Sequence, residues 1–250
     1  MSRDPDSERL VELEGCLNFR DLGGYGSRSG RRVRWGCLYR SDALHHMTDE
    51  DVRRVRDGLG VRAVVDLRSS AEIANYGIGP LPAPPVSYHH VPLFNGGHSD
   101  LELEEIPMDL GHQYFILLRV AWEAVRHTVE VLAHSTSPAI FHCAAGKDRT
   151  GLIAAVLLGL LDVDEEHIVE DYVFTSRVLD RILERLERST SYQKVFEHLP
   201  PDTFHAEPES MLSFLRRVRE AHGSVREFAL QGGLAAQTLE RLEERLLEEV

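Results

Sequence analysis

The chain reads AIFHCAAGKDRTG from Ala139 to Gly151, and this stretch decides the fold around it. An apolar run ends at Cys143, a short loop containing Gly146 follows, and Arg149 lies near the end of that loop. An apolar pattern with helical spacing begins directly afterwards. This order predicts a strand, a tight loop and a helix, with a thiol where the loop starts and a guanidinium where it ends.

The predicted loop has the chemistry of an anion site. A helix N-terminus offers unpaired N–H groups and the positive end of a dipole. Gly146 lets the backbone turn close to a ligand, and Arg149 can bind two phosphate oxygens at once. A cysteine in such a field should ionise readily, and the thiolate is the nucleophile. The alternative is a buried Cys143 beside a solvated arginine, but the surrounding strand, glycine and helix favour a phosphate site.

Composition places the chain among ordinary globular proteins. Its 250 residues are 42% hydrophobic and 28% charged, which is enough to build a real core. We expect a single domain over residues 1–250, with residues 1–15 partly frayed. The net charge of -13 argues against a nucleic-acid partner or an anionic membrane surface, although a local cationic pocket can still bind a small anion.

The sequence predicts a cytoplasmic protein. The first six residues lack the apolar core of a signal peptide, and no apolar run approaches the length of a membrane span, so we expect no membrane insertion. The three cysteines, Cys16, Cys37 and Cys143, are an odd number without framework spacing, and we expect reduced thiols.

Lysine is rare in this chain, and one lysine lies in the loop. Of the 28 Lys and Arg residues, two are lysines, Lys147 and Lys194. A compact ammonium at position 147 suits a point contact to phosphate where a second planar guanidinium would fit poorly. A chance surface lysine is the alternative at this place.

The rest of the pattern alternates strands with helices and then becomes helical. Strands are expected over residues 33–39, 61–67 and 86–93, and the acidic residues 94–108 are interpreted as a flap over the site. Thr48 is expected to cap a helix that ends at Gly58 and Gly60, and another helix should start near Ser70. Further helices are expected over residues 110–133, 164–186, 207–221 and 234–250. The pattern predicts one α/β domain with a helical C-terminal part.

Several segments together resemble the cysteine-dependent phosphatase superfamily. The Lys-Asp-Arg form of the loop is similar to the mycobacterial protein tyrosine phosphatase B type and its bacterial and fungal relatives. The resemblance spans nearly the whole chain and implies a phosphatase-like fold, with a mostly parallel central sheet flanked by helices. Besides the loop it rests, in order, on Asn18–Gly24, Tyr39–Ser41, Asp66–Ser69, Asp171–Tyr172, Gly223–Ser224 and Gly232–Leu234.

The resemblance implies hydrolysis of phosphate monoesters without a metal or other cofactor. The substrate would be a phosphorylated protein, with phosphotyrosine first and phosphoserine or phosphothreonine as further options, or a phosphoinositide. Cys143 would attack phosphorus and form a phosphocysteine, and Arg149 with the backbone of residues 144–149 would hold the phosphoryl oxygens. His142 would orient the loop and lower the cysteine pKa, Thr150 would assist breakdown of the intermediate, and Lys147 would add positive charge. The phosphate-binding residues are thus Ala144, Ala145, Gly146, Lys147, Asp148 and Arg149.

The general acid is the point where this chain departs from the family pattern. The leaving oxygen needs a proton, which an aspartate usually supplies. The place aligned with the family's candidate aspartate holds Asn95, which has no carboxyl proton to donate. We therefore expect Asp148 to be the acid because the loop fixes it near the leaving group. Asp100 in the expected flap is the alternative and would require the flap to close.

Other patterns have plainer interpretations. The pairs His45–His46 and His89–His90 place neighbouring side chains on opposite faces of a strand, so neither pair is expected to chelate a metal. Asp21 with Arg20, and Asp66 with Arg68, are expected to tie segments together by hydrogen bonds, with a place near the active loop as the alternative. Cys16 and Cys37 are expected to be core thiols, with a redox partner for Cys143 as the alternative.

The sequence leaves two other functions open. One is a sulfur-transfer or arsenate enzyme, which also uses a thiolate in an anion loop, although His142 and Thr150 disfavour it. The other is a phosphate-reading module without catalysis. The intact Cys143 and Arg149 argue against such a module, whereas Asn95 is compatible with it.

Overall fold

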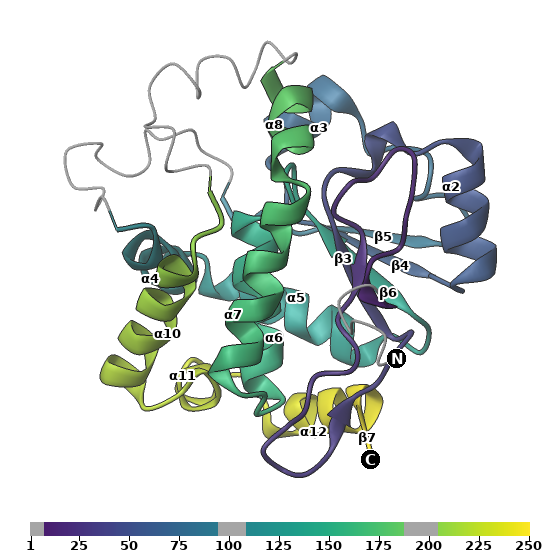
Figure 1. Ribbon diagram of the computed structural model, residues 1–250. Helices are drawn as coiled ribbons and strands as arrows, with labels where there is room; N and C mark the ends of the chain where they lie inside the picture. The colour runs from purple at the N-terminus through teal and green to yellow at the C-terminus, as the bar shows by residue number, and fades with distance from the viewer. Residues whose placement is uncertain (1–7, 95–108, 188–204) are drawn as a thin grey trace, which may run out of the picture.

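A five-stranded sheet lies at the centre of the computed structural model, which describes residues 8–94, 109–187 and 205–250 (Figure 1). The strand order is β1-β3-β6-β4-β5. β1 runs antiparallel to β3, and the other neighbours are parallel. The sheet is therefore mostly parallel, as the resemblance implied. The strand bounds are Arg20–Asp21 for β1, Leu38–Ser41 for β3, Ala63–Asp66 for β4, Ser87–His90 for β5 and Ala139–His142 for β6.

Helices cover both faces of this sheet because its inner strands alternate apolar side chains between two cores. Val65 and Phe141 point into the larger core, which contains α5 (Trp122–His134) and α6 (Asp148–Leu160). Val64 and Ile140 point the other way, into a smaller core with α2 (Asp49–Arg53). Figure 1 shows α2 on the opposite side of the sheet from α5 and α6. A strand buried on both faces carries a continuous apolar run, and β4 and β6 do so.

The helix after the phosphate-type loop lies inside the protein. Ten of the 13 residues of α6 are buried, so this helix has no polar face. It packs against α7 (Glu165–Phe174). A helix that is apolar all round must be covered on every side, and here the sheet and the later helices cover it. The loop is thereby held on a rigid, buried element.

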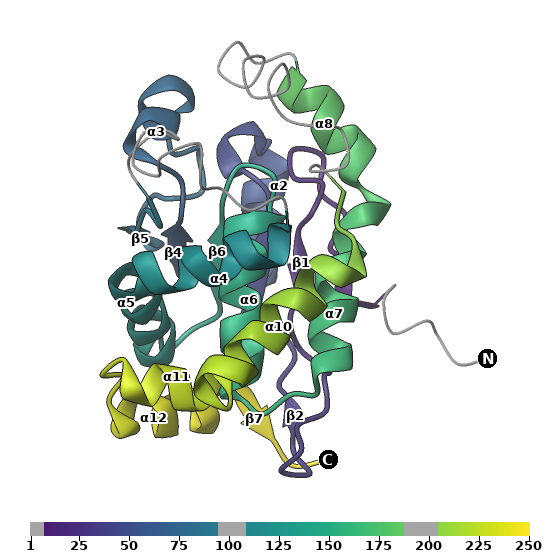
Figure 2. The same ribbon diagram turned by 90° about the vertical axis from the view of Figure 1, so that its left-hand side faces the viewer.

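The C-terminal part is helical, as expected, and closes over the larger core (Figure 2). α10 packs along α4, and α12 packs along α5. A second sheet pairs β2 with β7 and joins distant parts of the chain. The remaining bounds are β2 Arg32–Val33, η1 Leu44–His46, η2 Arg54–Gly58, α3 Ser70–Tyr76, α4 Leu110–Val120, η5 Thr175–Arg177, α8 Leu179–Glu187, α10 Pro208–His222, α11 Val225–Gln231, α12 Ala236–Leu246 and β7 Leu247–Glu248.

Most expected elements are present, and several bounds differ. The strand predicted over residues 33–39 is two strands in two sheets, because Gly36 turns the chain at a φ of 71°. The helix predicted over 110–133 breaks at Ala121, and the one over 164–186 breaks at η5. The helix predicted over 234–250 ends at Leu246, and α11 was not predicted. The helix after Thr48 starts with the expected cap.

The structure bears on the expectations about membrane spans and about the N-terminal segment. Within residues 8–94, 109–187 and 205–250, no helix is long and apolar enough to cross a membrane. Part of the segment expected to be frayed packs on the body: Arg9 is buried, and its guanidinium lies 3.5 Å from the centre of the Tyr25 ring. The expected flap lies, from residue 95 to 108, outside the described residues.

Candidate active site

The central strand, the loop and the helix are arranged as the sequence predicted. β6 is the middle strand, Cys143 follows its last residue, and α6 begins at Asp148. Gly146 in the loop has a φ of 69°, which disfavours any side chain. A Cβ atom there would also lie 2.7 Å from the carbonyl carbon and oxygen of Ser41. Glycine is therefore required at this position both by backbone conformation and by space.

Four successive backbone carbonyl groups of the loop accept hydrogen bonds from residues around the loop. In a trans peptide the C=O and the following N–H point in opposite directions. The N–H groups of residues 144–147 are therefore turned away from these contacts, toward the interior of the loop, where they can bind an anion. The contacts are His142 Nδ1 to Cys143 O at 3.2 Å, Ala43 N to Ala144 O at 3.0 Å, Asn18 Nδ2 to Ala145 O at 3.1 Å and Arg40 Nη2 to Gly146 O at 2.7 Å.

A buried ion cluster lies behind the loop. Arg20 Nε donates to one carboxylate oxygen of Asp171 at 2.9 Å, and Arg40 Nη1 donates to the other. All three side chains are at most 1% exposed. Burial alone would raise the pKa of Asp171, but the two guanidinium groups outweigh it and hold the pKa below its ordinary value. The cluster fixes the Arg40 side chain that holds the loop.

Asp148 lies at the start of α6 within a polar cluster of its own. Lys147 Nζ is 2.8 Å from Asp148 Oδ1, and the Tyr114 hydroxyl donates to the same oxygen at 2.6 Å. Tyr114 also lies 2.9 Å, oxygen to oxygen, from the hydroxyl of Tyr172. Burial would raise the pKa of Asp148, but the Lys147 ammonium and the hydrogen bonds from Lys147 and Tyr114 hold it below its usual range. Asp148 is thus ionised at neutral pH in the free protein.

Arg149 is held by a carboxylate that the sequence interpretation did not single out. Arg149 Nη1 and Nη2 donate to the two oxygens of Glu72 at 2.6 and 2.8 Å. The same Glu72 accepts a hydrogen bond from Ser69 N at 2.7 Å, where it completes the capping box of α3. The Ser-x-x-Glu pattern at 69–72 could have indicated the cap, but nothing local indicates the contact with Arg149, 77 residues away.

Cys143, Thr150 and His142 are the remaining predicted site residues, and all three are buried. Cys143 is 2% exposed, and all three cysteines are free thiols, as expected. The Thr150 hydroxyl is buried and has no hydrogen-bond partner among the described residues. Burial lowers the pKa of His142, with Arg68 adding to that effect and Asp66 opposing it, so the imidazole is neutral. Its Nδ1 contacts the loop at the Cys143 carbonyl, and the roles expected of His142 stay predictions.

The other candidate residues have the plainer roles expected of them, or lie elsewhere. Asp21 accepts hydrogen bonds from the backbone N–H groups of Gly23 and Gly36, and Arg68 binds Asp66 at 2.6 Å. Asp66 also accepts a hydrogen bond from the Tyr88 hydroxyl at 3.0 Å, so both aspartates join segments of the chain by hydrogen bonds. Arg20, however, binds Asp171 and not Asp21. Asp100, the alternative acid, lies outside the described residues. Within the described ranges, no group of three or more His, Cys, Asp or Glu side chains is arranged to hold a metal ion.

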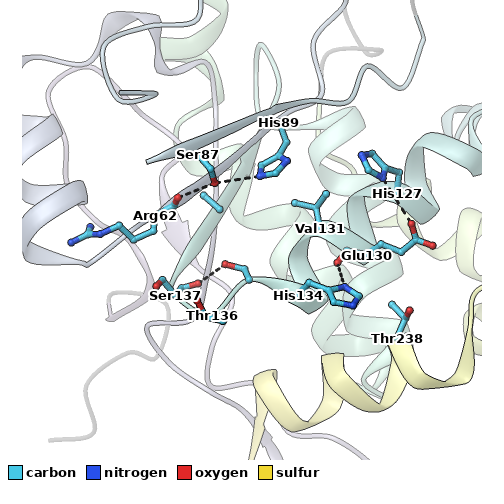
Figure 3. A pocket seen from close by; sticks show the side chains of 12 residues that line it. Arg62, Ser87, His89, His127, Glu130, Val131, His134, Thr136, Ser137 and Thr238 are labelled. Atoms are coloured by element: carbon cyan, nitrogen blue, oxygen red, sulfur yellow. Dashed lines mark hydrogen bonds and ion pairs between the residues drawn. The ribbon is translucent and has the colours of Figure 1, made fainter. Parts of the chain in front are cut away.

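Two cavities lie at opposite ends of the parallel strands. One, of about 420 Å³, is lined partly by Ala144 of the loop and by Glu72, at the carboxyl end. The other, of about 690 Å³, lies at the amino end, beside Ala63 and Ser87 where β4 and β5 begin (Figure 3). Its lining includes three histidines, His89, His127 and His134. The first cavity is adjacent to the predicted chemistry, whereas the second is remote from it.

Comparison with known proteins agrees with this geometry. The chain is 26% identical over 278 residues to the triple specificity protein phosphatase PtpB of Mycobacterium tuberculosis, covering 94% of this chain and 98% of that protein. It is 31% identical to a tyrosine-protein phosphatase of Nostoc commune over 58% of this chain and 50% of that one.

Solved structures with weak overall similarity include two phosphatases. The core catalytic domain of Siw14 from Saccharomyces cerevisiae has a TM-score of 0.39 and 14% identity, over 77% of this chain and 97% of that chain. TpbA from Pseudomonas aeruginosa has a TM-score of 0.31 and 21% identity, over 60% of this chain and 77% of that chain. A family model described as the tyrosine phosphatase family matches residues 11–248. With a cysteine at the end of the central strand, an arginine at the start of the following helix and this match over nearly its whole length, the chain belongs to the tyrosine phosphatase family.

Proposed function

We propose that the protein hydrolyses phosphate monoesters, with phosphotyrosine as its first substrate, through a phosphocysteine at Cys143. The observation that carries this proposal is the loop itself. Its carbonyl groups are tied outward, so that the N–H groups of residues 144–147 and the side chain of Arg149 can surround a phosphoryl group next to the Cys143 thiol. Donors fixed in advance stabilise the charge that spreads over the phosphoryl oxygens during transfer.

The proposed reaction has two steps. The Cys143 thiolate forms a bond to phosphorus, the bond from phosphorus to the tyrosine oxygen breaks, and that oxygen takes a proton from Asp148. Water then attacks the phosphocysteine and releases inorganic phosphate, while the thiolate leaves with help from the Thr150 hydroxyl. Lys147 stands beside Asp148 and supplies positive charge at the rim of the loop. Phosphoserine, phosphothreonine and phosphoinositides are further candidate substrates of the same loop.

Asp148 fits the role of acid only in its protonated form. Its pKa is held low in the free protein, so the proton has to be acquired when the substrate binds. A phosphate dianion near the carboxylate raises the carboxyl pKa, because like charges disfavour ionisation. Binding of the substrate would therefore convert Asp148 into the form that donates.

The test is phosphate release from phosphotyrosine peptides and from a panel of phosphoinositides. We expect turnover by the native protein and a loss of at least about a thousandfold in Cys143→Ser, because the nucleophile is gone. Cys37→Ser is the matched control, since Cys37 is a partly buried thiol outside the loop and its loss should leave turnover in place. Release that is unchanged in Cys143→Ser would overturn the phosphocysteine mechanism. No release from any substrate, together with binding of the phosphopeptides, would replace this proposal with a phosphate-binding module.

A further inference from the structure

The cavity of about 690 Å³ at the amino end of the parallel strands has no part in the proposed phosphatase chemistry, yet its volume is that of a small-molecule site. Three histidines line it, His89 from β5 and His127 and His134 from α5 (Figure 3). Val131 adds aliphatic surface to the same wall. The cavity thus combines polar rings with a place for a hydrocarbon chain.

Contacts within the protein fix the ring proton of two of these histidines. His134 Nδ1 lies 2.8 Å from Glu130 O, and because a carbonyl oxygen can only accept, that nitrogen carries the proton. The Ser87 hydroxyl donates its own proton to Arg62 O at 3.0 Å. His89 Nε2, 3.3 Å from that hydroxyl, is therefore the donor to Ser87. In the neutral rings, His134 Nε2 and His89 Nδ1 are left as hydrogen-bond acceptors.

His127 and Glu130 extend this set of acceptors. His127 Nδ1 faces Glu130 Oε2 at 3.8 Å, which favours the proton on Nδ1 and leaves Nε2 as the acceptor of the neutral ring. Glu130 Oε1 accepts a hydrogen bond from Arg126 Nη1, so the other oxygen of the carboxylate is the one that lies nearer His127. Burial lowers the pKa of His89, and the neighbouring His127 lowers it further, which keeps that ring neutral at pH 7.

The charge around the cavity favours a cation. α5 ends at His134, and the last carbonyl groups of a helix have no partner within it and form the negative end of its dipole. The whole chain carries a net charge of -13. Of the nearby arginines, Arg126 is paired with Glu130. Arg62 Nη1 donates to Val61 O at 2.9 Å, and Figure 3 shows its guanidinium pointing away from the histidines. An ammonium group would therefore meet lone pairs and partial negative charge here.

The acceptors on α5 form a row and do not converge on one point. His127, Glu130 and His134 lie on one face of the helix, because residues three, four and seven positions apart do so. Neighbours in the row are about one turn apart, so the row is roughly 10 Å long. A zinc ion needs its ligands about 2 Å from one centre. Within the described ranges, no three His, Cys, Asp or Glu side chains are placed in that way. The row therefore suits an elongated ligand.

We propose that this cavity binds a linear polyamine, with its ammonium groups on the row of His127, Glu130 and His134 and its methylene chain against Val131. The amino groups of such a molecule are separated by three or four methylene groups, a spacing close to one helical turn. The methylene chain gains by covering aliphatic surface, and each ammonium supplies donors to an acceptor that lacks one. The site is separate from Cys143, and its occupation does not depend on the proposed phosphatase activity.

The experiment is a calorimetric titration of the full chain with spermidine at pH 8, where an ordinary histidine ring is neutral. We expect one molecule to bind per chain. The double variant His127→Ala with His134→Ala removes both ends of the row, and Glu130→Gln removes its charge. Each change should weaken the binding roughly tenfold, because hydrogen bonds to a charged group are lost.

The matched controls are His167→Ala and Glu170→Gln on α7. These two residues form a pair with the same spacing, His167 Nδ1 lying 2.7 Å from Glu170 Oε2, and they lie outside the cavity. Both controls should keep the native affinity. Equal losses in the controls, or Mg²⁺ binding as tightly as spermidine at the same ionic strength, would reduce the effect to general charge attraction and overturn the proposal. Tight binding of Zn²⁺ that the double variant abolishes would overturn it in favour of a metal.

A second measurement reads the ring protons directly. Long-range proton–nitrogen correlation spectra at pH 8 distinguish the two nitrogens of each histidine, and they should show the proton on Nδ1 in His127 and His134 and on Nε2 in His89. Spermidine should shift the signals of the bare nitrogens. The opposite tautomer in His134 would place a donor where the proposal needs an acceptor and would overturn it. Cys143→Ser should bind spermidine as the native protein does, which separates this site from the proposed phosphatase activity.

Discussion

Asp148 has to satisfy two opposed demands at the scale of a single residue. In the free protein it is a carboxylate, paired with Lys147 and hydrogen-bonded by Tyr114. As the proposed acid it must hold a proton when the leaving oxygen departs. Tyr114 links the two states, because its hydroxyl stabilises the ionised form and thereby lowers the pKa of Asp148. The Lys147 ammonium and the Tyr114 hydrogen bond together set the pH range over which the acid is available.

Removal of the hydrogen bond should shift the pH profile. In Tyr114→Phe the pKa of Asp148 should rise, because one of the hydrogen bonds that stabilise the ionised carboxylate is gone while Lys147 remains. Activity that needs the protonated acid falls as pH rises through this pKa, so the alkaline limb of kcat should move to higher pH in the variant. The measurement is kcat against pH with a phenyl phosphate, which has a poor leaving group.

Asp148→Asn provides the control for this assignment. It should remove the alkaline limb and slow poor leaving groups more than nitrophenyl phosphate, whose leaving group needs little protonation. Equal losses on both substrates would show that Asp148 acts on the structure of the loop and not as the acid.

The sequence predicts a role for those site residues whose partners lie close to them in sequence. The loop residues from His142 to Thr150 were predicted because strand, glycine, arginine and helix follow one another directly. Glu72 was not assigned a role, because its partner Arg149 lies 77 residues away. Asn18 was noted as part of a recurring segment, but its contact to Ala145 spans 127 residues and only the folded chain shows it.

At the scale of an element, the first turn of α3 serves the helix and the active site together. The Ser69 hydroxyl accepts a hydrogen bond from Glu72 N, and the Glu72 carboxylate accepts one from Ser69 N. The same carboxylate orients Arg149. The cap therefore places a negative charge at a fixed distance from the guanidinium, and a change in the helix start should reach the active site through it.

Two variants of α3 separate these roles. Glu72→Gln keeps the size of the side chain but removes its charge, and kcat/KM should fall roughly ten- to hundredfold as Arg149 loses its charged partner. Ser69→Ala removes the hydroxyl cap, which costs about 1 kcal/mol of helix stability, while the pair of Glu72 and Arg149 remains. Thermal unfolding and kcat/KM measured together distinguish them, and equal kinetic losses in both variants would contradict a specific role for Glu72.

The predicted helix boundaries agree with the structure where a capping residue or another local signal marks them. Thr48 caps its helix as predicted, and α3 begins at Ser70, where a helix start was expected. The break at Ala121 has no glycine or proline to announce it. There Trp122 begins α5, and its indole N–H donates to Gly232 O at 2.7 Å. That contact comes from the helical C-terminal part, and a long periodic pattern alone could not reveal it.

At the scale of the whole molecule, Asp171 joins parts of the chain that lie far apart in sequence. It binds Arg20 beside the N-terminal segment and Arg40 on β3, and Arg40 in turn holds the loop at Gly146. The carboxylate itself belongs to α7. Stability and loop geometry therefore depend on the same buried charges.

Removal of this charge should destabilise the protein strongly. Asp171→Asn leaves Arg20 and Arg40 buried without their anion, and a loss of about 3–5 kcal/mol in the free energy of unfolding is expected. Asp164→Asn is the control, because its pair with Arg28 is half exposed and should contribute about 0–1 kcal/mol. Urea denaturation measures both, and similar losses in the two variants would rule out a special role for the buried cluster.

The outward hold on the loop carbonyls also affects the end of a turnover. Because His142, Ala43, Asn18 and Arg40 hold the loop carbonyls in the ligand-free protein, we expect the loop to keep its shape when a ligand binds. It would then offer the released phosphate ion the same donors as the ester. Product inhibition follows from that rigidity, and phosphate buffer would both compete with substrate and protect the folded chain against heat.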